Sequence, residues 1–74
     1  MHQHSDEQKL TVVLRHWMDH NRSHVEDFEK WAEKARSSGY EKVSERILEA
    51  AEQMARANEV LEQALGELND SGGA

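Results

Sequence analysis

The stretch Ser37-Ser38-Gly39 decides the fold, because it is the one strong break in an otherwise helix-forming chain. Proline is absent, and helix-forming residues run without interruption up to this point. Glycine readily takes the left-handed backbone conformation that ends a helix. We therefore predict one helix over about residues 6–37 and a second over about residues 40–68, joined by a short turn.

The outer ends of the two predicted helices have weaker signals. Ser5 is expected to cap the first helix, since acidic residues follow it and Gln8 stands three positions later, as in a capping box. Residues 1–4 and 70–74 are expected to be flexible tails, because they are short, polar or glycine-rich. The whole chain, residues 1–74, is then a single helical-hairpin domain.

Both halves of the chain repeat apolar and amide residues at alternating steps of three and four, which is typical of helices packed along a heptad seam. The seam of the first half is predicted to contain Leu10, Leu14, Trp17, Asn21, His24, Phe28, Trp31 and Ala35. That of the second half is predicted to contain Ile47, Ala51, Met54, Asn58, Leu61, Leu65 and Leu68. A short turn makes the helices antiparallel neighbours, which places Asn21 opposite Asn58 and Trp31 opposite Ile47. The predicted fold class is an all-α antiparallel helical hairpin.

The size of the chain points to self-association. With 74 residues, a single core is marginal, and the absence of cysteine excludes disulfides as a remedy. Apolar residues such as Val13, Val25 and Val43 also widen the stripes beyond what two helices can cover. We therefore expect two hairpins to pair as a homodimer and form a four-helix bundle.

Composition excludes several classes of function. The net charge is −6, from 15 acidic and 9 basic residues, so no basic face for nucleic acid is expected. No apolar run is long enough to span a membrane and no signal-peptide pattern is present, which favours a soluble, cytoplasmic protein. Neither a glycine-rich phosphate loop nor a nucleophile elbow occurs, so we do not expect an enzyme.

A row of histidines is the strongest chemical signal in the chain. His16, His20 and His24 follow one another at intervals of four, so a helix places them about one turn apart on one side, with Asp27 on the same flank. Imidazoles at this spacing can chelate a metal ion, and a carboxylate or a third histidine can complete the shell. The predicted metal ligands are thus His16, His20, His24 and Asp27. Nitrogen and oxygen donors without sulfur suit nickel, zinc, cobalt or copper.

A structural role for the same residues is the alternative. Asn21 and Asn58 in facing seams predict a buried polar layer that fixes register, and His24 could belong to it. The protein would then be a non-catalytic homodimeric interaction module. The tail histidines, His2 and His4, offer a second and weaker place for a metal. The residues alone leave these alternatives open.

The string His16-Trp17-Met18-Asp19-His20-Asn21-Arg22-Ser23-His24, followed by Phe28, Trp31-Ala32 and Gly39, resembles a known domain. It is similar to a small helical hairpin found with nickel-accessory proteins of the CooT type, whose motif reads His-Trp-x-x-His-Asn-x-x-His. The resemblance covers most of residues 12–68. It implies handling of nickel or a related transition metal, with the three histidines as the corresponding positions, and a metallochaperone or metalloprotein as partner.

This chain departs from the CooT-type proteins in one respect, because it lacks their cysteine-bearing N-terminal nickel domain. The resemblance therefore leaves two functions open for the hairpin. It can bind a metal itself, for trafficking, storage or sensing. Alternatively, it can serve only to dimerise and to dock with a partner.

Overall fold

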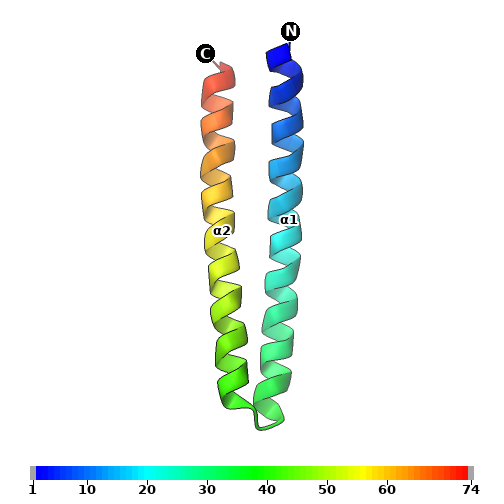
Figure 1. Ribbon diagram of the computed structural model, residues 1–74, viewed down its shortest axis with the longest axis vertical. Coiled ribbons are helices and arrows are strands. Elements are labelled where there is room, and N and C mark those ends of the chain that lie inside the picture. The colour runs from blue at the N-terminus through cyan, green and yellow to red at the C-terminus, as the bar shows by residue number, and fades with distance from the viewer. Residues whose placement is uncertain (1, 74) are drawn as a thin grey trace.

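The computed structural model describes residues 2–73 of the chain and the side chains of residues 6–70. Two long helices, α1 (His2–Ser37) and α2 (Glu41–Gly73), lie side by side, with both ends of the chain at the same end of the molecule (Figure 1). The two helices are therefore antiparallel. The predicted all-α helical hairpin is confirmed.

Both helices extend further toward the chain ends than predicted. α1 begins before Ser5, so this residue lies inside the helix and not at its cap. α2 continues past Leu68 to Gly73, since no proline interrupts it. Flexibility of residues 1–4 and 70–74 in solution stays a prediction, and its outermost positions, Met1 and Ala74, lie outside the described residues.

The turn between the helices is built on Gly39, as predicted. This glycine has a φ of 94°, in the left-handed region that other residues rarely adopt. The Tyr40 N–H donates to the Ala35 carbonyl at 2.8 Å, and the Gly39 N–H donates to the Arg36 carbonyl at 3.0 Å. These two bonds form a Schellman motif, which satisfies carbonyls that the end of α1 would otherwise leave unpaired.

A pair of asparagines joins the helices near their middle. Asn21 Nδ2 donates to Asn58 Oδ1 at 3.0 Å, and Asn58 Nδ2 donates to the main-chain carbonyl of Met18 at 2.9 Å. The predicted pairing of Asn21 with Asn58 is therefore confirmed. Since any shift along the helices would break both bonds, this polar layer fixes their register.

The seam that each helix presents to the other agrees with the prediction on α2 and differs on α1. Every predicted seam residue of α2 from Ile47 to Leu68 is buried or half-buried. The shielded stripe of α1 contains Thr11, Leu14, Met18, Asn21, Val25, Phe28, Ala32 and Ala35. The prediction is wrong at Leu10, Trp17 and Trp31, whose side chains are 49%, 48% and 59% exposed.

Compared with the prediction, α1 is rotated about its own axis, and side-chain packing explains this. The predicted and observed stripes share every second position, and they differ in whether the larger or the smaller set of side chains turns inward. The observed orientation places Ala32, only 1% exposed, in the seam, and Ala51 of α2 is 5% exposed. Small side chains at these positions let the narrow space between two helices be filled without the bulk of an indole ring.

The hairpin is a thin rod, measuring 57 × 14 × 11 Å. Its radius of gyration is 16.8 Å, whereas a compact domain of this length would have about 11 Å. Among the described side chains, no large one is fully buried. A single hairpin thus has a seam between its helices but no enclosed core. Neither α1 nor α2 is long and apolar enough, over the residues described, to cross a membrane.

Candidate functional site

One side of the hairpin, next to the seam, carries large exposed apolar residues. On α1 this side follows a repeat of seven residues, and α2 contributes a second stripe with the same repeat. The two stripes contain Leu10, Trp17, His24 and Trp31 on α1, and Val43, Ala50, Ala57 and Ala64 on α2. They lie on the same side, because Trp31 and Ala50 line one open hollow of about 290 Å³ together with Phe28 and Ile47. We call this uncharged surface the aromatic face.

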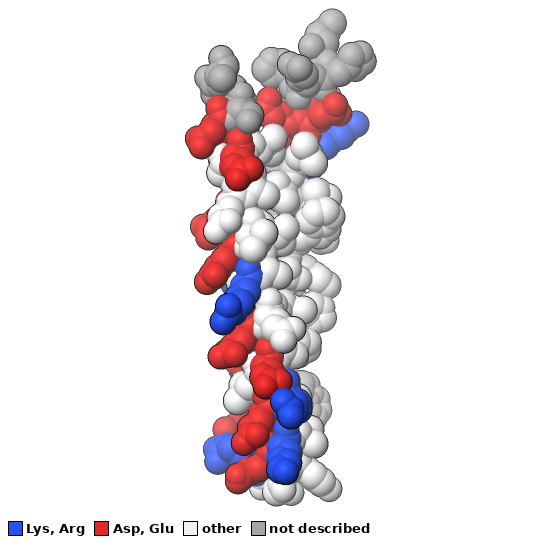
Figure 2. Space-filling view, turned by 60° about the vertical axis from the view of Figure 1, so that its left-hand side comes forward, with Lys and Arg blue, Asp and Glu red and all other residues white. Residues whose placement is uncertain are grey.

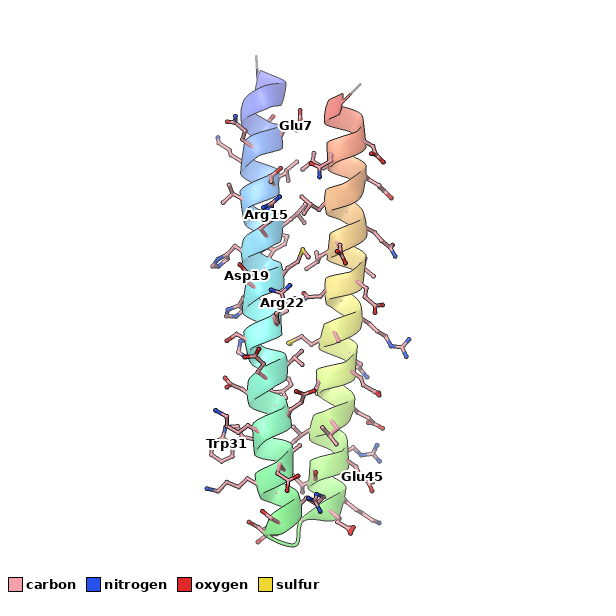
Figure 3. All side chains as sticks on the ribbon, turned by 180° about the vertical axis from the view of Figure 1, so that it is seen from behind. Glu7, Arg15, Asp19, Arg22, Trp31 and Glu45 are labelled. Carbon is pink, nitrogen blue, oxygen red and sulfur yellow. The ribbon has the colours of Figure 1, made fainter. Side chains whose placement is uncertain are left out.

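The other side of the seam has the opposite character. Its stripes contain Arg15, Arg22, Glu29 and Arg36 on α1, and Glu45, Glu52 and Glu59 on α2, with Leu48 and Ala55 between these glutamates. Arg22 and Glu59 line a hollow of about 250 Å³ there. We call this surface the charged face. Figure 2 shows charged side chains gathered along the left of the molecule and few on its right, and Figure 3 shows Arg15, Arg22 and Glu45 on the rear side.

The histidine row lies along the outer edge of the aromatic face. His20 Nε2 and His24 Nε2 approach to 3.0 Å, and the two rings meet edge to face with centroids 4.4 Å apart and an interplanar angle of 84°. Four residues of helix separate them, so their side chains project from successive turns and can converge. His20 is exposed and His24 half-buried, which leaves the pair open to solvent on one side.

Packing against the seam positions this pair. The His24 ring lies 6.0 Å from the Phe28 ring between centroids, at an angle of 43°. Phe28 is itself half-buried between the helices. An aromatic neighbour anchored in the seam restricts the rotation of the His24 ring. The ring is thereby held with its Nε2 directed at His20.

The remaining two predicted ligands are not part of this pair. His16 stacks on His20 with centroids 6.2 Å apart and an interplanar angle of 19°, so the two rings are parallel and not convergent. Asp27 is exposed. Across the described residues, no three histidine, aspartate or glutamate side chains come close enough together to hold a metal ion. A single hairpin thus gathers two of the four predicted ligands.

The contact between His20 and His24 permits two kinds of chemistry. Without a metal, 3.0 Å is a hydrogen bond from one protonated ring nitrogen to an unprotonated one. With metal–nitrogen bonds of about 2.1 Å, a separation of 3.0 Å corresponds to an angle of about 90° at the ion. That is the angle between adjacent ligands in square-planar and octahedral sites, and it is smaller than the tetrahedral angle that structural zinc prefers.

The asparagine layer is separate from the histidines. The side chain of Asn58 bonds to Asn21 and to the carbonyl of Met18, while His24 bonds to His20. The expectation that His24 could join the polar layer is therefore not met by these hydrogen bonds. The asparagines fix the seam, and the histidines form their own cluster outside it.

These features define a two-helix antiparallel hairpin with a paired-histidine cluster beside an uncharged face. The chain belongs to the family described as "Domain of unknown function (DUF8180)", whose model matches residues 10–68. A protein of Archaeoglobus fulgidus, described as an uncharacterized protein, is 36% identical over 58 residues, which make up 78% of this chain and 92% of that protein. No solved structure matches the chain significantly. Neither description names a metal or a partner.

Proposed function

We propose that this protein binds a divalent transition metal through His20 and His24, for trafficking, storage or sensing of that metal. The observation that carries the proposal is the 3.0 Å approach of the two Nε2 atoms on an exposed surface. Two imidazoles already held at the separation that a chelated ion requires lose little freedom on binding. A pair of this kind is a known starting point for metal sites on helices.

Nickel is the metal we favour. The angle of about 90° that the two nitrogens would make at an ion suits the square-planar or octahedral geometry of nickel(II) and copper(II) better than tetrahedral zinc. The resemblance of the motif from His16 to His24 to a hairpin found with nickel-accessory proteins points the same way. Zinc and cobalt are the weaker candidates.

The proposal includes pairing of two hairpins into a homodimeric four-helix bundle. The exposure of Trp17 and Trp31, at 48% and 59%, supports it. So does the rod-like shape of the single hairpin, which has no enclosed core. In a bundle of four helices, a second layer covers such a surface, which buries the exposed tryptophans and encloses a core.

A non-catalytic interaction module is the second candidate function, and the aromatic face favours it. Large exposed apolar surfaces usually mark sites of association. In this case the contact between His20 and His24 would be a hydrogen bond without a metal. A metallochaperone or another metalloprotein would then be the partner, and the hairpin would supply only a docking surface.

Equilibrium dialysis of the protein without an affinity tag against nickel, copper, cobalt and zinc separates the two candidates. Replacing both ligands in His20→Ala/His24→Ala should weaken nickel binding by at least about 100-fold, since each lost ligand costs about tenfold or more. His16→Ala is the matched control from the same row and should change the affinity by less than about threefold. Circular dichroism confirms that each variant stays helical.

Either of two results would overturn the proposal. Nickel binding that survives the double substitution would place the site elsewhere, and His2→Ala/His4→Ala would then test the tail. Absence of tight binding to any of the four metals, by a protein that still dimerises, would leave the interaction module as the function.

A further inference from the structure

We infer that the aromatic face is covered by a second copy of this chain, and that two copies together hold one metal ion through four imidazoles, His20 and His24 from each. The metal part of this inference rests on the proposed function. The dimer part rests on the surface of the hairpin alone.

The exposed area of the hairpin leaves room for a partner of its own size. The chain exposes 6072 Å². A compact monomer of 8.5 kDa would expose about 4,700 Å², so the hairpin has roughly 1,400 Å² in excess. Stable interfaces bury about 800 Å² on each partner, and obligate dimers bury more. One interface with a second hairpin therefore accounts for the surplus.

The composition of the aromatic face suits a second copy. It presents large side chains on α1, such as Trp17 and Trp31, and small ones on α2, such as Ala50 and Ala57. When two α1 stripes cross in antiparallel directions, the bulky side chains of one can fall between those of the other, because they recur only at intervals of seven. The α1 stripe also lies roughly a quarter turn around the helix from the seam, which is the placement that a second neighbour takes in a four-helix bundle.

Charge favours the same occupant. Each chain carries a net charge of −6, so two copies repel least when their acidic side chains stay in water. The stripes of the aromatic face contain no ionised residue, and Lys34, whose Nζ lies 5.6 Å from the centre of the Trp31 ring, can extend its ammonium from the edge of the face into water. Contact through this face also leaves both charged faces in water.

The metal site needs the second copy because one hairpin supplies too few ligands. His20 and His24 form a pair, and the described residues hold no third ligand near them. Transition metals take four or more ligands in their stable protein sites. A second identical pair would supply four imidazoles without any other residue type.

A two-fold axis beside the histidine pair is compatible with close packing of the faces. The pair lies close to the middle of the α1 stripe, which runs from Leu10 to Trp31. Two α1 helices crossing this axis in antiparallel directions overlap along most of the stripe. In such an isologous contact, His20 of one copy meets His24 of the other, and the reverse contact follows from the symmetry.

Metal stoichiometry, measured by native mass spectrometry and sedimentation of the protein titrated with nickel, is the first test. We expect a dimer with one nickel ion per two chains, and a His20→Ala/His24→Ala variant that stays dimeric but loses the metal. One tightly bound ion on each monomeric chain would overturn the inference and leave the proposed function standing. A dimer that binds none of nickel, copper, cobalt and zinc would overturn the shared site and the proposed function together.

Spin labels on single cysteines test the arrangement of the two copies. The chain has no cysteine, so Ser23→Cys and Ser37→Cys each give one label, at exposed positions of α1. Crossing α1 helices should hold the labels at position 23 within about 25 Å and those at position 37 about 45 Å apart, from a rise of 1.5 Å per residue. Similar distances at both positions would indicate parallel α1 helices, which would overturn the shared four-imidazole site.

Discussion

The two side faces of the hairpin come from the same two helices and differ in how complete they are. On the charged face and the outer surfaces near it, side chains find partners within one helix, as Arg22 does with Asp19 at 2.9 Å and Arg36 with Glu33 at 2.6 Å. These exposed pairs contribute little to stability, and water satisfies the rest. On the aromatic face, Trp17 and Trp31 stay 48% and 59% exposed, although the Lys34 ammonium lies 5.6 Å from the centre of the Trp31 ring.

This difference indicates which surface of a single hairpin is stable in water and which one calls for a partner. In a lone hairpin, water solvates a charged surface well. An exposed indole is stabilised when another apolar surface covers it. The histidine pair borders this surface, and in the proposed dimer it would supply two of the four imidazoles. The following experiments test whether this one side of the hairpin carries both self-association and metal binding, from the largest expected effect to the smallest.

Charges placed on the aromatic face should abolish self-association. In Trp17→Glu/Trp31→Glu, four carboxylates would have to be buried against each other in the dimer, so we expect its dissociation constant to rise by more than about 100-fold. The control is Val12→Glu, which alters a residue that is 68% exposed and lies one heptad before Asp19, away from the aromatic face. Sedimentation velocity measures both. Equal loss of association in the two variants would remove the distinction between the faces.

Acid should release the metal. Ligation requires an unprotonated ring nitrogen, and imidazole ordinarily takes up a proton near pH 6.5, so protons compete as the pH falls below this value. We therefore expect the nickel affinity at pH 5.5 to be at least about tenfold weaker than at pH 7.5, because binding of the ion must displace protons from its imidazole ligands. Calorimetric titration at the two pH values measures it. An unchanged affinity would contradict ligation by His20 and His24.

Substitutions in the asparagine pair should change the stability of the seam between the helices. Asn21→Ala removes the donor to Asn58 Oδ1 in a half-buried site and should lower the free energy of unfolding by about 1–2 kcal/mol. Replacing both residues in Asn21→Leu/Asn58→Leu should recover this stability, since no polar group is then left unpaired. Urea unfolding compares the three proteins. A double variant less stable than the single one would show that the pair itself is a net source of stability.

The turn should show an effect no larger than that of the asparagine pair. Gly39→Ala should lower the free energy of unfolding by about 1–2 kcal/mol at most, because a Cβ at a φ of 94° strains the backbone although nothing lies within 4 Å of it. Gly66→Ala is the matched control inside α2, where an added Cβ also meets nothing within 4 Å. It should stabilise the helix by about 0.5–1 kcal/mol. Thermal unfolding that moves in the same direction for both would contradict the assignment of the turn.

The sequence was sufficient to predict the hairpin, because its signals are local or pairwise. Gly39 marks the turn, and the steps of three and four mark the helices. Asn21 and Asn58 then set the register, since they interrupt two apolar seams at matching distances from the turn. Each of these signals is independent of side-chain volume.

The rotation of α1 could not be predicted from periodicity. Its two overlapping stripes share Leu14 and Phe28, and differ by whether Trp31 or Ala32 turns inward. Both satisfy the heptad repeat, and the volume between the helices decides between them. A signal was nevertheless present in the sequence, since the two tryptophans of α1 lie fourteen residues apart and Ala50, Ala57 and Ala64 of α2 recur at intervals of seven.

The candidate site was predicted in part for a related reason. Helical spacing places all three histidines along one side, but their nitrogens converge only where ring rotation is fixed. Phe28 next to His24 provides that restriction, while His16 stacks parallel to its neighbour. The distinction between the pair and the outer residues depends on these side-chain contacts, which spacing does not encode.

Anomalous diffraction at the nickel absorption edge, from crystals grown with nickel, tests the central claim most directly. The account predicts one peak for every two chains, within about 2.1 Å of Nε2 of His20 and His24 from both copies, beneath paired aromatic faces. A peak held by one chain alone, or by His2 and His4, would contradict it, as would tryptophans left in solvent.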